Sequence, residues 1–310
     1  MLHNNNALII KNLTKVYSKK SEKEIKALNK LNLEVKEGEI FGLLGPNGAG
    51  KTTFLNILAG TVIKSEGSVN VWGFDLDKNP RQVRASIGIV PQEVNLDAFF
   101  NPEALLELQA GLYGIPKKER ITNTILKLVS LEKQANTYSR SLSGGMKRRL
   151  LIAKAMVHRP PILVLDEPST GVDVELKQKL WNNIRALNKE GVTIILTTHL
   201  MHEAQEMCDR IAILNKGNLV KLDTTNNLLD SIKIKKITFK VKETIKIVQK
   251  NLNGIEFIYK PNNEITATYE RKKHKIEELI NIVKQSGMEI YDITTDEGGL
   301  EDVFIDVTKN

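Results

Sequence analysis

The sequence has little cysteine, few aromatic residues and no long apolar run. Its single cysteine, Cys208, cannot form an intramolecular disulfide, which fits a reducing compartment. No segment approaches the roughly 18 consecutive apolar residues that a membrane-spanning helix requires. The first residues have neither the basic nor the apolar part of a secretory signal. These absences predict a cytoplasmic chain that does not cross a membrane by itself.

The charge balance is basic, since 45 Lys and Arg oppose 37 Asp and Glu and give a formal charge of +8. An excess of this sign predicts acidic partners, such as nucleotides or anionic lipid headgroups. Residues 231–250 hold seven lysines and one acid, and apolar residues alternate with them as in a strand. Two explanations remain open: a solvated edge strand protected from aggregation, or attraction to an anionic membrane surface. Aromatic residues do not interleave with these lysines, so we expect no nucleic-acid partner.

Up to about residue 230, short apolar strands alternate with helices, and this order predicts an α/β fold with a mainly parallel sheet. Residues of about 95–160 are mostly helical, which predicts an inserted helical subdomain. We therefore expect a first domain over residues 1–230. Its predicted strands are residues 7–13, 31–35, 39–44, 87–90, 162–165 and 192–198.

The remaining residues, 231–310, have a pattern that predicts a small C-terminal α+β domain. Predicted strands and helices follow one another roughly as β-α-β-β-α-β. The strands are expected at 237–241, 255–259, 265–269 and 289–293, and the helices at 244–251 and 274–285.

Polar, chemically competent residues follow three of the predicted strands of the first domain. A glycine-rich loop begins after Leu44, two acids follow Leu165, and His199 follows Thr198. Parallel sheets bind ligands beyond the carboxyl ends of their strands. The sequence therefore predicts one site built from three strand ends.

The loop after the first of these strands has the sequence GPNGAGKT and fits the pattern G-x-x-x-x-G-K-[ST]. Backbone N–H groups of such a loop, together with the N-terminus of the following helix, bind phosphate oxygens. Lysine in this position neutralises the β- and γ-phosphates, and the next hydroxyl binds Mg²⁺. The predicted nucleotide-binding residues here are Gly45, Pro46, Asn47, Gly48, Ala49, Gly50, Lys51, Thr52 and Thr53.

Two acids emerge from a buried strand at the mouth of this predicted site. Asp166 is placed to hold Mg²⁺ directly or through water, and Glu167 to orient or deprotonate the attacking water. Adjacent acids often only begin a solvated helix, but the four apolar residues before them disfavour that explanation. A lone histidine is usually structural; because His199 lies level with the other strand ends, we expect it to contact the γ-phosphate or the water.

A second glycine-rich element, LSGGM at residues 142–146, stands about twenty residues ahead of the acidic strand. With the phosphate loop and the acids, in this order, residues 7 to about 225 resemble the ATP-binding subunit of an ABC transporter. By this resemblance the loop is the Walker A motif, Asp166 the Walker B aspartate and Glu167 the catalytic glutamate. His199 matches the switch histidine. The residues predicted to be catalytic include Lys51 of the Walker A motif as well as Glu167 and His199.

The resemblance assigns further residues. Tyr17 matches the aromatic residue that stacks on adenine, and Gln92 matches the Q-loop glutamine, which contacts Mg²⁺ and water and links the site to the membrane partner. Residues 169–173 match the D-loop. The signature contributes Ser143, Gly144 and Gly145, although it ends in Met146 where glutamine is commonest.

Within the family, residues 146–149, 171–173 and 300–304 look most like those of ABC-2-type exporter ATPases. This resemblance implies that two subunits, identical or similar, enclose two Mg-ATP molecules between Walker A of one and the signature of the other. It further implies an integral-membrane permease as partner, and a location on the inner face of the cell membrane. Two alternatives are a non-transport ABC ATPase, disfavoured because this chain has one cassette and no long coiled coil, and a nucleotide-gated binding module, disfavoured by Glu167 and His199.

Overall fold

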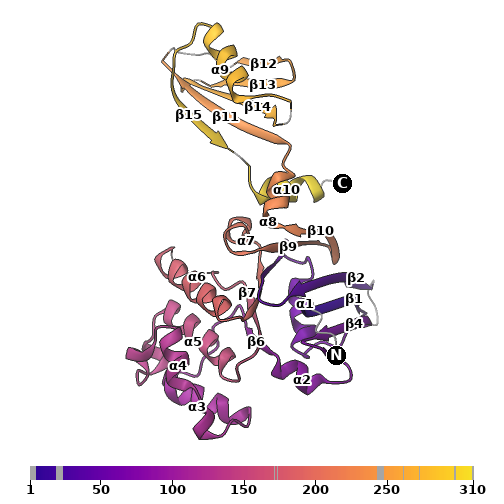
Figure 1. Ribbon diagram of the computed structural model, residues 1–310, viewed down its shortest axis with the longest axis vertical. Coiled ribbons are helices and arrows are strands. Elements are labelled where there is room, and N and C mark those ends of the chain that lie inside the picture. The colour runs from indigo at the N-terminus through magenta and orange to yellow at the C-terminus, as the bar shows by residue number, and fades with distance from the viewer. Residues whose placement is uncertain are drawn as a thin grey trace. The chain divides into compact units, whose positions relative to one another are not determined.

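The computed structural model (Figure 1) describes residues 5–18, 24–170, 172, 174–242, 248–260, 262–271, 273–296 and 298–308. Its contacts divide the chain into two compact units, Met1–Thr224 and Thr225–Asn310. Among the described residues, none of the helices combines the length and the apolar composition that crossing a bilayer demands.

A six-stranded sheet forms the centre of the first unit, in the order β10-β9-β3-β8-β7-β6. The pairs β3–β9, β3–β8, β8–β7 and β7–β6 are parallel, and only β9–β10 is antiparallel. The prediction of a mainly parallel sheet is therefore confirmed. Its strands are β3 (Ile40–Leu44), β6 (Ile87–Val90), β7 (Ile162–Asp166), β8 (Thr193–Thr198), β9 (Arg210–Asn215) and β10 (Asn218–Thr224).

A second sheet of the first unit is antiparallel, with the order β2-β1-β4-β5. Two of its strands were expected, but their pairing into a separate sheet was not predicted. The long pair β1–β2 buries its alternate apolar residues against α1 and the central sheet. Its strands are β1 (Asn6–Tyr17), β2 (Ile25–Lys36), β4 (Glu66–Val71) and β5 (Phe74–Asp75).

Helices of the first unit follow the strands as an α/β alternation requires. Three of them, α3, α4 and α5, lie together as a helical group between β6 and β7 in the chain (Figure 1). The chain breaks between them at the predicted places, around Gly114 and just before Gly144. The helices are α1 (Lys51–Leu58), α2 (Pro80–Ala85), α3 (Pro102–Leu112), α4 (Thr122–Leu128), α5 (Gly144–Met156), α6 (Val174–Lys189) and α7 (Met201–Met207).

The second unit packs helix α9 on a five-stranded sheet with the order β12-β13-β14-β11-β15. Alternate residues such as Phe239 and Phe257 are fully buried on one face, as the period of two predicts. Its elements are α8 (Thr225–Asp230), β11 (Ile234–Val241), β12 (Val248–Leu252), β13 (Ile255–Lys260), β14 (Glu264–Glu270), α9 (Ile276–Gln285), β15 (Ile290–Asp296) and α10 (Leu300–Thr308).

The helix predicted at 244–251 is wrong where the structure describes that segment, because residues 248–252 form strand β12. This strand pairs with β13 through a two-residue turn, Asn253-Gly254, in which both residues have positive φ, 52° and 81°. Asn-Gly is the most favoured sequence for such a hairpin turn. The turn signal outweighs the helical spacing of the preceding apolar residues; residues 243–247 lie outside the described part.

One interpretation of the sequence placed the lysine-rich strand, β11, at the edge of its sheet, and this prediction is wrong. β11 lies between β14 and β15, and two lysines of this stretch, Lys240 in β11 and Lys242 just beyond it, contact acids in β15 or just before it. The ammonium of Lys240 is 2.9 Å from Asp292, and that of Lys242 is 2.6 Å from Glu289. These lysines are therefore matched by local acids rather than gathered as an unopposed basic surface.

Candidate functional site

Four parallel strands, β3, β8, β7 and β6, are neighbours in the central sheet, so their carboxyl ends share one edge. The sequence predicted three of these ends to converge; β6, which leads to Gln92, adds the fourth. Each strand is short and almost wholly buried, which fixes the point where polar residues emerge. The edge collects Lys51, Gln92, Glu167 and His199 from four separate segments.

The predicted phosphate loop, residues 45–52, joins β3 to α1 and depends on glycine in two places. A Cβ on Gly45 would lie 2.5 Å from the carbonyl oxygen of Leu214, so the loop packs directly on β9. Gly50, which precedes α1, has a φ of +107°, a conformation that favours glycine. The loop is thus shaped by the neighbouring strands, and it places the N-terminus of α1 at the edge of the sheet.

Lys51 lies inside this loop and is only 6% exposed. Its ammonium donates to the carbonyl oxygens of Gly45, at 2.6 Å, and Pro46, at 3.3 Å. Burial lowers the pKa of Lys51, and the carboxylates of Glu167 and Asp166 oppose that shift. A cation held by neutral carbonyls in a desolvated loop is well prepared to bind an anionic ligand.

The carboxylate of Glu167 contacts the side chains of Lys51, Gln92 and His199, and these four residues are called the hub of the site. Its Oε1 lies 3.0 Å from Nδ1 of His199 and 3.8 Å from the Lys51 ammonium. Its Oε2 accepts hydrogen bonds from the Gln92 amide, at 3.1 Å, and from the Thr170 hydroxyl, at 3.3 Å. The structure therefore brings together all four residues predicted as catalytic: Lys51, Gln92, Glu167 and His199.

The backbone of Glu167 is strained, with a φ of +44° in a non-glycine residue. Such a conformation costs of order 1–3 kcal/mol and persists where the surroundings over-determine it. Here the N–H group donates to the carbonyl of Thr197, at 3.1 Å, and the carbonyl accepts from the guanidinium of Arg148, at 3.1 Å. Neighbouring strand β8 and helix α5 therefore hold the residue from both sides.

Asp166 ends β7, and its Oδ1 accepts a hydrogen bond of 2.6 Å from the hydroxyl of Thr197. No cluster of three or more His, Cys, Asp or Glu side chains suited to a metal exists among the described residues. Mg²⁺ in nucleotide sites does not require such a cluster, because one or two protein oxygens together with substrate phosphates and water complete its coordination shell. The hydroxyl of Thr52, the carboxylate of Asp166 and the amide oxygen of Gln92 have the hard oxygen chemistry that fits this ion.

Tyr17 lies at the end of β1 and is 40% exposed, with the Lys15 ammonium 4.7 Å from the centre of its ring. Among the residues that the structure describes, no hydrogen bond or ring contact joins Tyr17 to the loop. It pairs with Ile25 of β2, and β2 reaches the loop two residues later, where a Cβ on Gly50 would meet the carbonyl of Ala27 at 2.6 Å. Tyr17 therefore stands on the strand pair that flanks the loop.

Of the three predicted signature residues, Ser143 and Gly144 are exposed, and in the described part of the chain none of the three shares a hydrogen bond with the hub. Ser143 caps α5, its hydroxyl accepting from the N–H of Met146 at 3.3 Å, and Gly144 has open space around it. Gly145 is buried. Of the matching D-loop, Ser169 and Thr170 are described and lie beside the hub, whereas Gly171 and Asp173 lie outside the described residues.

Sequence reasoning missed three supporting residues. The hydroxyl of Thr197 donates directly to the carboxylate of Asp166. Glu203 of α7 is fully buried, accepts from the Ser169 hydroxyl at 2.6 Å and pairs with Lys177 at 2.7 Å. Arg148 of α5 reaches the backbone of Glu167. Only their contacts across distant segments distinguish them from ordinary polar residues, and the sequence alone carries no such information.

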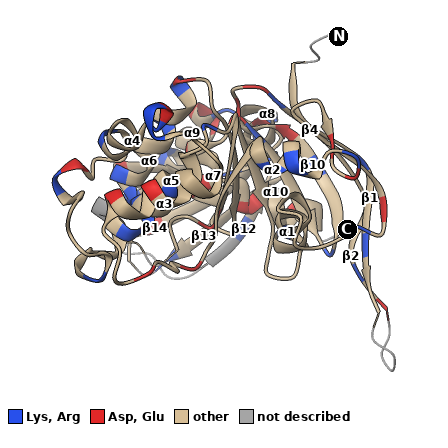
Figure 2. Cartoon of the chain, turned by 90° about the horizontal axis from the view of Figure 1, so that it is seen from below, with Lys and Arg blue, Asp and Glu red and all other residues tan. Residues whose placement is uncertain are grey.

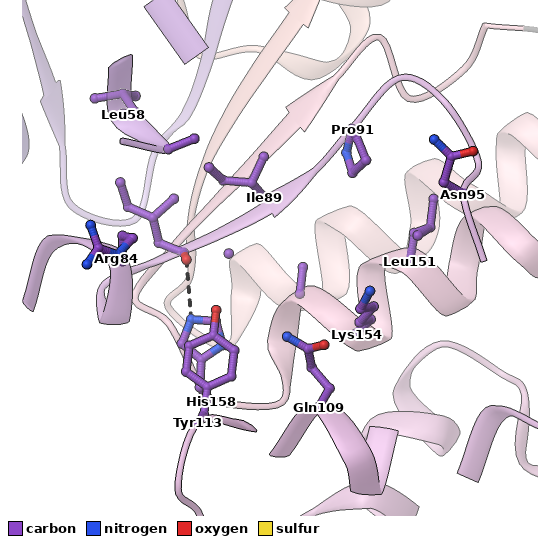
Figure 3. Close-up of a pocket in the computed structure, with 14 residues that line it drawn as sticks. Leu58, Arg84, Ile89, Pro91, Asn95, Gln109, Tyr113, Leu151, Lys154 and His158 are labelled. Carbon is purple, nitrogen blue, oxygen red and sulfur yellow. Dashed lines mark hydrogen bonds between the residues drawn. The ribbon is translucent and has the colours of Figure 1, made fainter. Parts of the chain in front are cut away.

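Beside the site, a groove of about 300 Å³ lies between β6, α1, α2 and the helices α3 and α5 (Figure 3). The rings of Tyr113 and His158 stack in it with centroids 3.9 Å apart. Burial lowers the pKa of His158, whose Nε2 lies 3.2 Å from the carbonyl of Ile87. Arg84 and Lys154 line the groove, and no acid does.

Comparisons with known proteins identify the family of this site. The family profile described as ABC transporter matches residues 28–170. A Nod factor export ATP-binding protein I of Rhizobium etli is 36% identical over 228 residues, covering 73% of this chain and 71% of that protein. The chain belongs to the ABC transporter family, as an ATP-binding subunit. The protein of the same name from Cupriavidus pinatubonensis is 38% identical over 206 residues, and this chain spans 63% of its length.

Solved structures agree with this assignment. A dimeric ATP-binding cassette in a post-hydrolysis state, bound to ADP and Pi, has 30% identity and a TM-score of 0.61 over 70% of this chain and 98% of its own. CbiO1 of Clostridium perfringens, part of an ABC transporter complex, has 26% identity and a TM-score of 0.65, with 74% and 92% covered. The predicted family and the P-loop fold are confirmed, and the sequence relatives named above are export proteins.

Proposed function

We propose that this chain hydrolyses Mg-ATP within a dimer and thereby drives a separate membrane permease of an exporter. One observation carries the proposal: the carboxylate of Glu167 is held by His199, Gln92 and Thr170 within reach of Lys51, at the mouth of a phosphate-binding loop. A carboxylate so oriented is suited to align a water molecule for attack on a phosphoryl group.

In the proposed reaction, backbone N–H groups of residues 45–53 and the Lys51 ammonium bind the phosphates, and Tyr17 stacks on the adenine. Glu167 accepts the hydrogen bond of the attacking water while His199 holds the carboxylate in place. Attack forms a bond to the γ-phosphorus and breaks its bond to the bridging oxygen, which leaves with ADP. Mg²⁺, held by Thr52, Asp166 and Gln92, neutralises the phosphate charge when bound.

Dimerisation follows from the position of the signature. Ser143 and Gly144 are exposed at the N-terminus of α5, and within their own subunit they are not part of the hub. N–H groups at this helix end are suited to bind the phosphate of an ATP held by the loop of a second subunit. Two such subunits, identical or similar, would enclose two ATP molecules.

The groove beside the site supports a permease contact. Residues of β6, just before Gln92, and residues of the helical group line the groove. A molecule bound there would therefore contact both β6 and the helical group, and movement of either would displace it. Exposed apolar residues of the same helix α3, Leu108 at 48% and Leu112 at 74%, are the chain neighbours of the lining residues Gln109 and Tyr113. Because Arg84 and Lys154 bring positive charge and no acid lines the groove, a permease helix with acidic or amide side chains fits it best.

The proposed location follows from this partner: the cytoplasmic face of the membrane, with peripheral contact made through the permease. Because acids pair with Lys240 and Lys242, these two lysines give little support to an independent contact with anionic lipid. Export is the direction that the names of the relatives indicate, and we propose the same direction here.

Glu167→Gln tests the hydrolytic role. We expect magnesium-dependent ATP turnover to fall about 100-fold or more, since general-base catalysis contributes factors of this size. ATP should hold this variant as a dimer, measured by light scattering after gel filtration. Glu206→Gln, a half-exposed glutamate on α7, is the control and should keep both turnover and the wild-type oligomeric state. A Glu167→Gln variant that turns over ATP normally, or stays monomeric in saturating ATP, would contradict the proposal.

Arg84→Glu tests the permease contact. Charge reversal in the groove should abolish copurification of the integral-membrane partner from detergent extracts, while ATP binding is unchanged. Arg81→Glu is the matched control, because it lies on the same short helix but does not line the groove. Equal recovery of the membrane protein with both variants would rule out the groove as the docking surface.

A further inference from the structure

Arg148 is the most deeply buried cation of the helical group, with 2% of its surface exposed. It lies on α5, five residues after the signature serine, Ser143. Burial lowers the pKa of Arg148, and the nearby carboxylate of Asp166 opposes that shift. A buried charge is costly unless its hydrogen-bonding capacity is used, so its contacts indicate what it does.

All three guanidinium nitrogens of Arg148 donate to backbone carbonyls of the nucleotide site. Nη1 is 2.7 Å from the carbonyl oxygen of Pro91, Nε is 2.9 Å from that of Pro168, and Nη2 is 3.1 Å from that of Glu167. None of the ion pairs found in the described residues includes Arg148. The planar fork therefore serves as a geometric clamp rather than as half of a salt bridge.

The clamped carbonyls belong to the two segments that carry the reacting side chains. Pro91 immediately precedes Gln92, and Glu167 and Pro168 form the start of the other segment. Gln92 and Glu167 also bond each other through their side chains, at 3.1 Å. Since Glu167 has a strained backbone with φ of +44°, its orientation depends on such external bonds.

We propose that Arg148 is a positioning residue that fixes the backbones of Glu167 and of the Gln92 segment to the signature helix. Nucleotide bound at the N-terminus of α5 would then align the catalytic glutamate of the same subunit through this guanidinium. This inference rests on the catalytic role proposed for Glu167. In this way Arg148 would link two nucleotide sites: the one to which the signature of its own subunit contributes in the partner, and the one formed by the Walker A loop and Glu167 of its own subunit.

Arg149 provides a matched control, because it is the next residue of the same helix and also donates to two carbonyls, those of Val129 and Ser130. Those acceptors lie at the end of α4, not in the nucleotide site. Loss of either arginine should destabilise the helical group, but only loss of Arg148 should misplace the reacting residues.

The test compares Arg148→Gln, Arg148→Lys and Arg149→Gln by ATP affinity, steady-state kinetics and thermal unfolding. For Arg148→Gln we expect kcat to fall about 10- to 100-fold, as misplacement of a reacting group by about 1 Å does. KM and the Kd for ATP should stay within about twofold, because the interaction acts only on the chemical step. Arg148→Lys, which has a single ammonium nitrogen in place of the planar fork, should recover the thermal stability but not kcat. This variant keeps the test available if Arg148→Gln does not fold. Arg149→Gln should lose stability and keep kcat.

A double variant separates positioning from general destabilisation. Because Arg148 acts through Glu167, adding Arg148→Gln, or Arg148→Lys if the former does not fold, to Glu167→Gln should change the residual turnover by no more than about twofold. An additive loss, a normal kcat in Arg148→Lys, or an equal loss in Arg149→Gln would overturn the inference. If Glu167→Gln itself keeps normal turnover, the proposed catalytic role fails instead, which is a distinct result.

Discussion

Charged side chains are used differently in the two units of the chain. In the first unit Lys51, Arg148 and Glu167 are each less than 10% exposed and lie in one network at the edge of the sheet. In the second unit the pairs Lys240–Asp292 and Lys242–Glu289 lie in solvent, with 38–65% of each side chain exposed. Buried charges of this kind are expensive and mark function, whereas exposed pairs contribute little to stability.

The signs of the charges are mixed along the helices of the first unit. Figure 2 shows basic and acidic residues interspersed along helices α3 to α6. The formal charge of +8 therefore does not by itself define a binding surface. Position relative to the strand ends, rather than the amount of charge, distinguishes the functional residues.

Lys51→Ala should produce the largest difference between the units. Without the ammonium, phosphate charge in the loop is no longer neutralised, and we expect ATP turnover to fall about 100-fold or more. Thermal stability should hold or rise, because a cation with a pKa lowered by burial is removed while Glu167 keeps His199 and Gln92. Lys240→Ala is the control and should leave turnover unchanged. Turnover is measured as release of phosphate. Equal turnover in both variants would show that the buried lysine of the first unit is no more important for function than the exposed lysine of the second.

Phe239→Ala should have the opposite profile. Phe239 is fully buried in the core of the second unit, and truncation of such a side chain costs about 3–5 kcal/mol. All predicted site residues lie in the first unit, so ATP turnover at low temperature should stay within about twofold. Two-step urea unfolding, with the weaker step shifted, would support separate units. Loss of ATP binding in parallel would show that the second unit maintains the site.

Two glycines sharpen the comparison within the site itself. Gly45→Ala places a Cβ 2.5 Å from the carbonyl oxygen of Leu214, and overpacking of this kind costs about 1–3 kcal/mol. Gly144→Ala meets nothing within 4 Å. We therefore expect Gly45→Ala to lose both stability and ATP affinity, and Gly144→Ala to keep both but to lose ATP-induced dimerisation in the Glu167→Gln background. A Gly144→Ala variant that still dimerises would argue against the composite pocket.

The two units also differ in how far the sequence predicted them. In the first unit the strands that end at Leu44, Val90, Asp166 and Thr198 were placed correctly, since buried parallel strands are apolar runs bounded by glycine or acid. The four residues predicted as catalytic meet in space because neighbouring strands of a parallel sheet end at one edge. The separate antiparallel sheet was not predicted, because its register depends on pairing between distant segments.

In the second unit, β12 was mistaken for a helix because five apolar and polar residues fit either period. The Asn253-Gly254 turn could have corrected this prediction. Arg148 shows a different limit. Its place in the basic run 147–149 gives no sign of burial, and only the fold reveals that its side chain is buried and donates to the carbonyls of Pro91 and Glu167.

The smallest expected effect concerns the exposed pair Lys240–Asp292. The hydrogen bond that the Lys240 ammonium donates to the Asp292 carboxylate lowers the pKa of Asp292 and raises the pKa of Lys240. A lowered carboxyl pKa adds stability above the unfolded value, about 3.9, that is lost as pH falls through the folded pKa. A raised lysine pKa adds stability that is fully present below about 10.4 and is lost as pH rises through the folded pKa.

The pair should therefore stabilise the second unit slightly across neutral pH and not at the acidic or basic extreme. Asp292→Asn should lower the urea midpoint marginally at pH 7, and the difference from the wild-type chain should shrink both at high salt and as pH falls below the carboxyl pKa. A large difference in urea midpoint that does not depend on salt would mean that this pair behaves like the buried network around Glu167. Solvent exposure would then not explain the contrast between the charged residues of the two units.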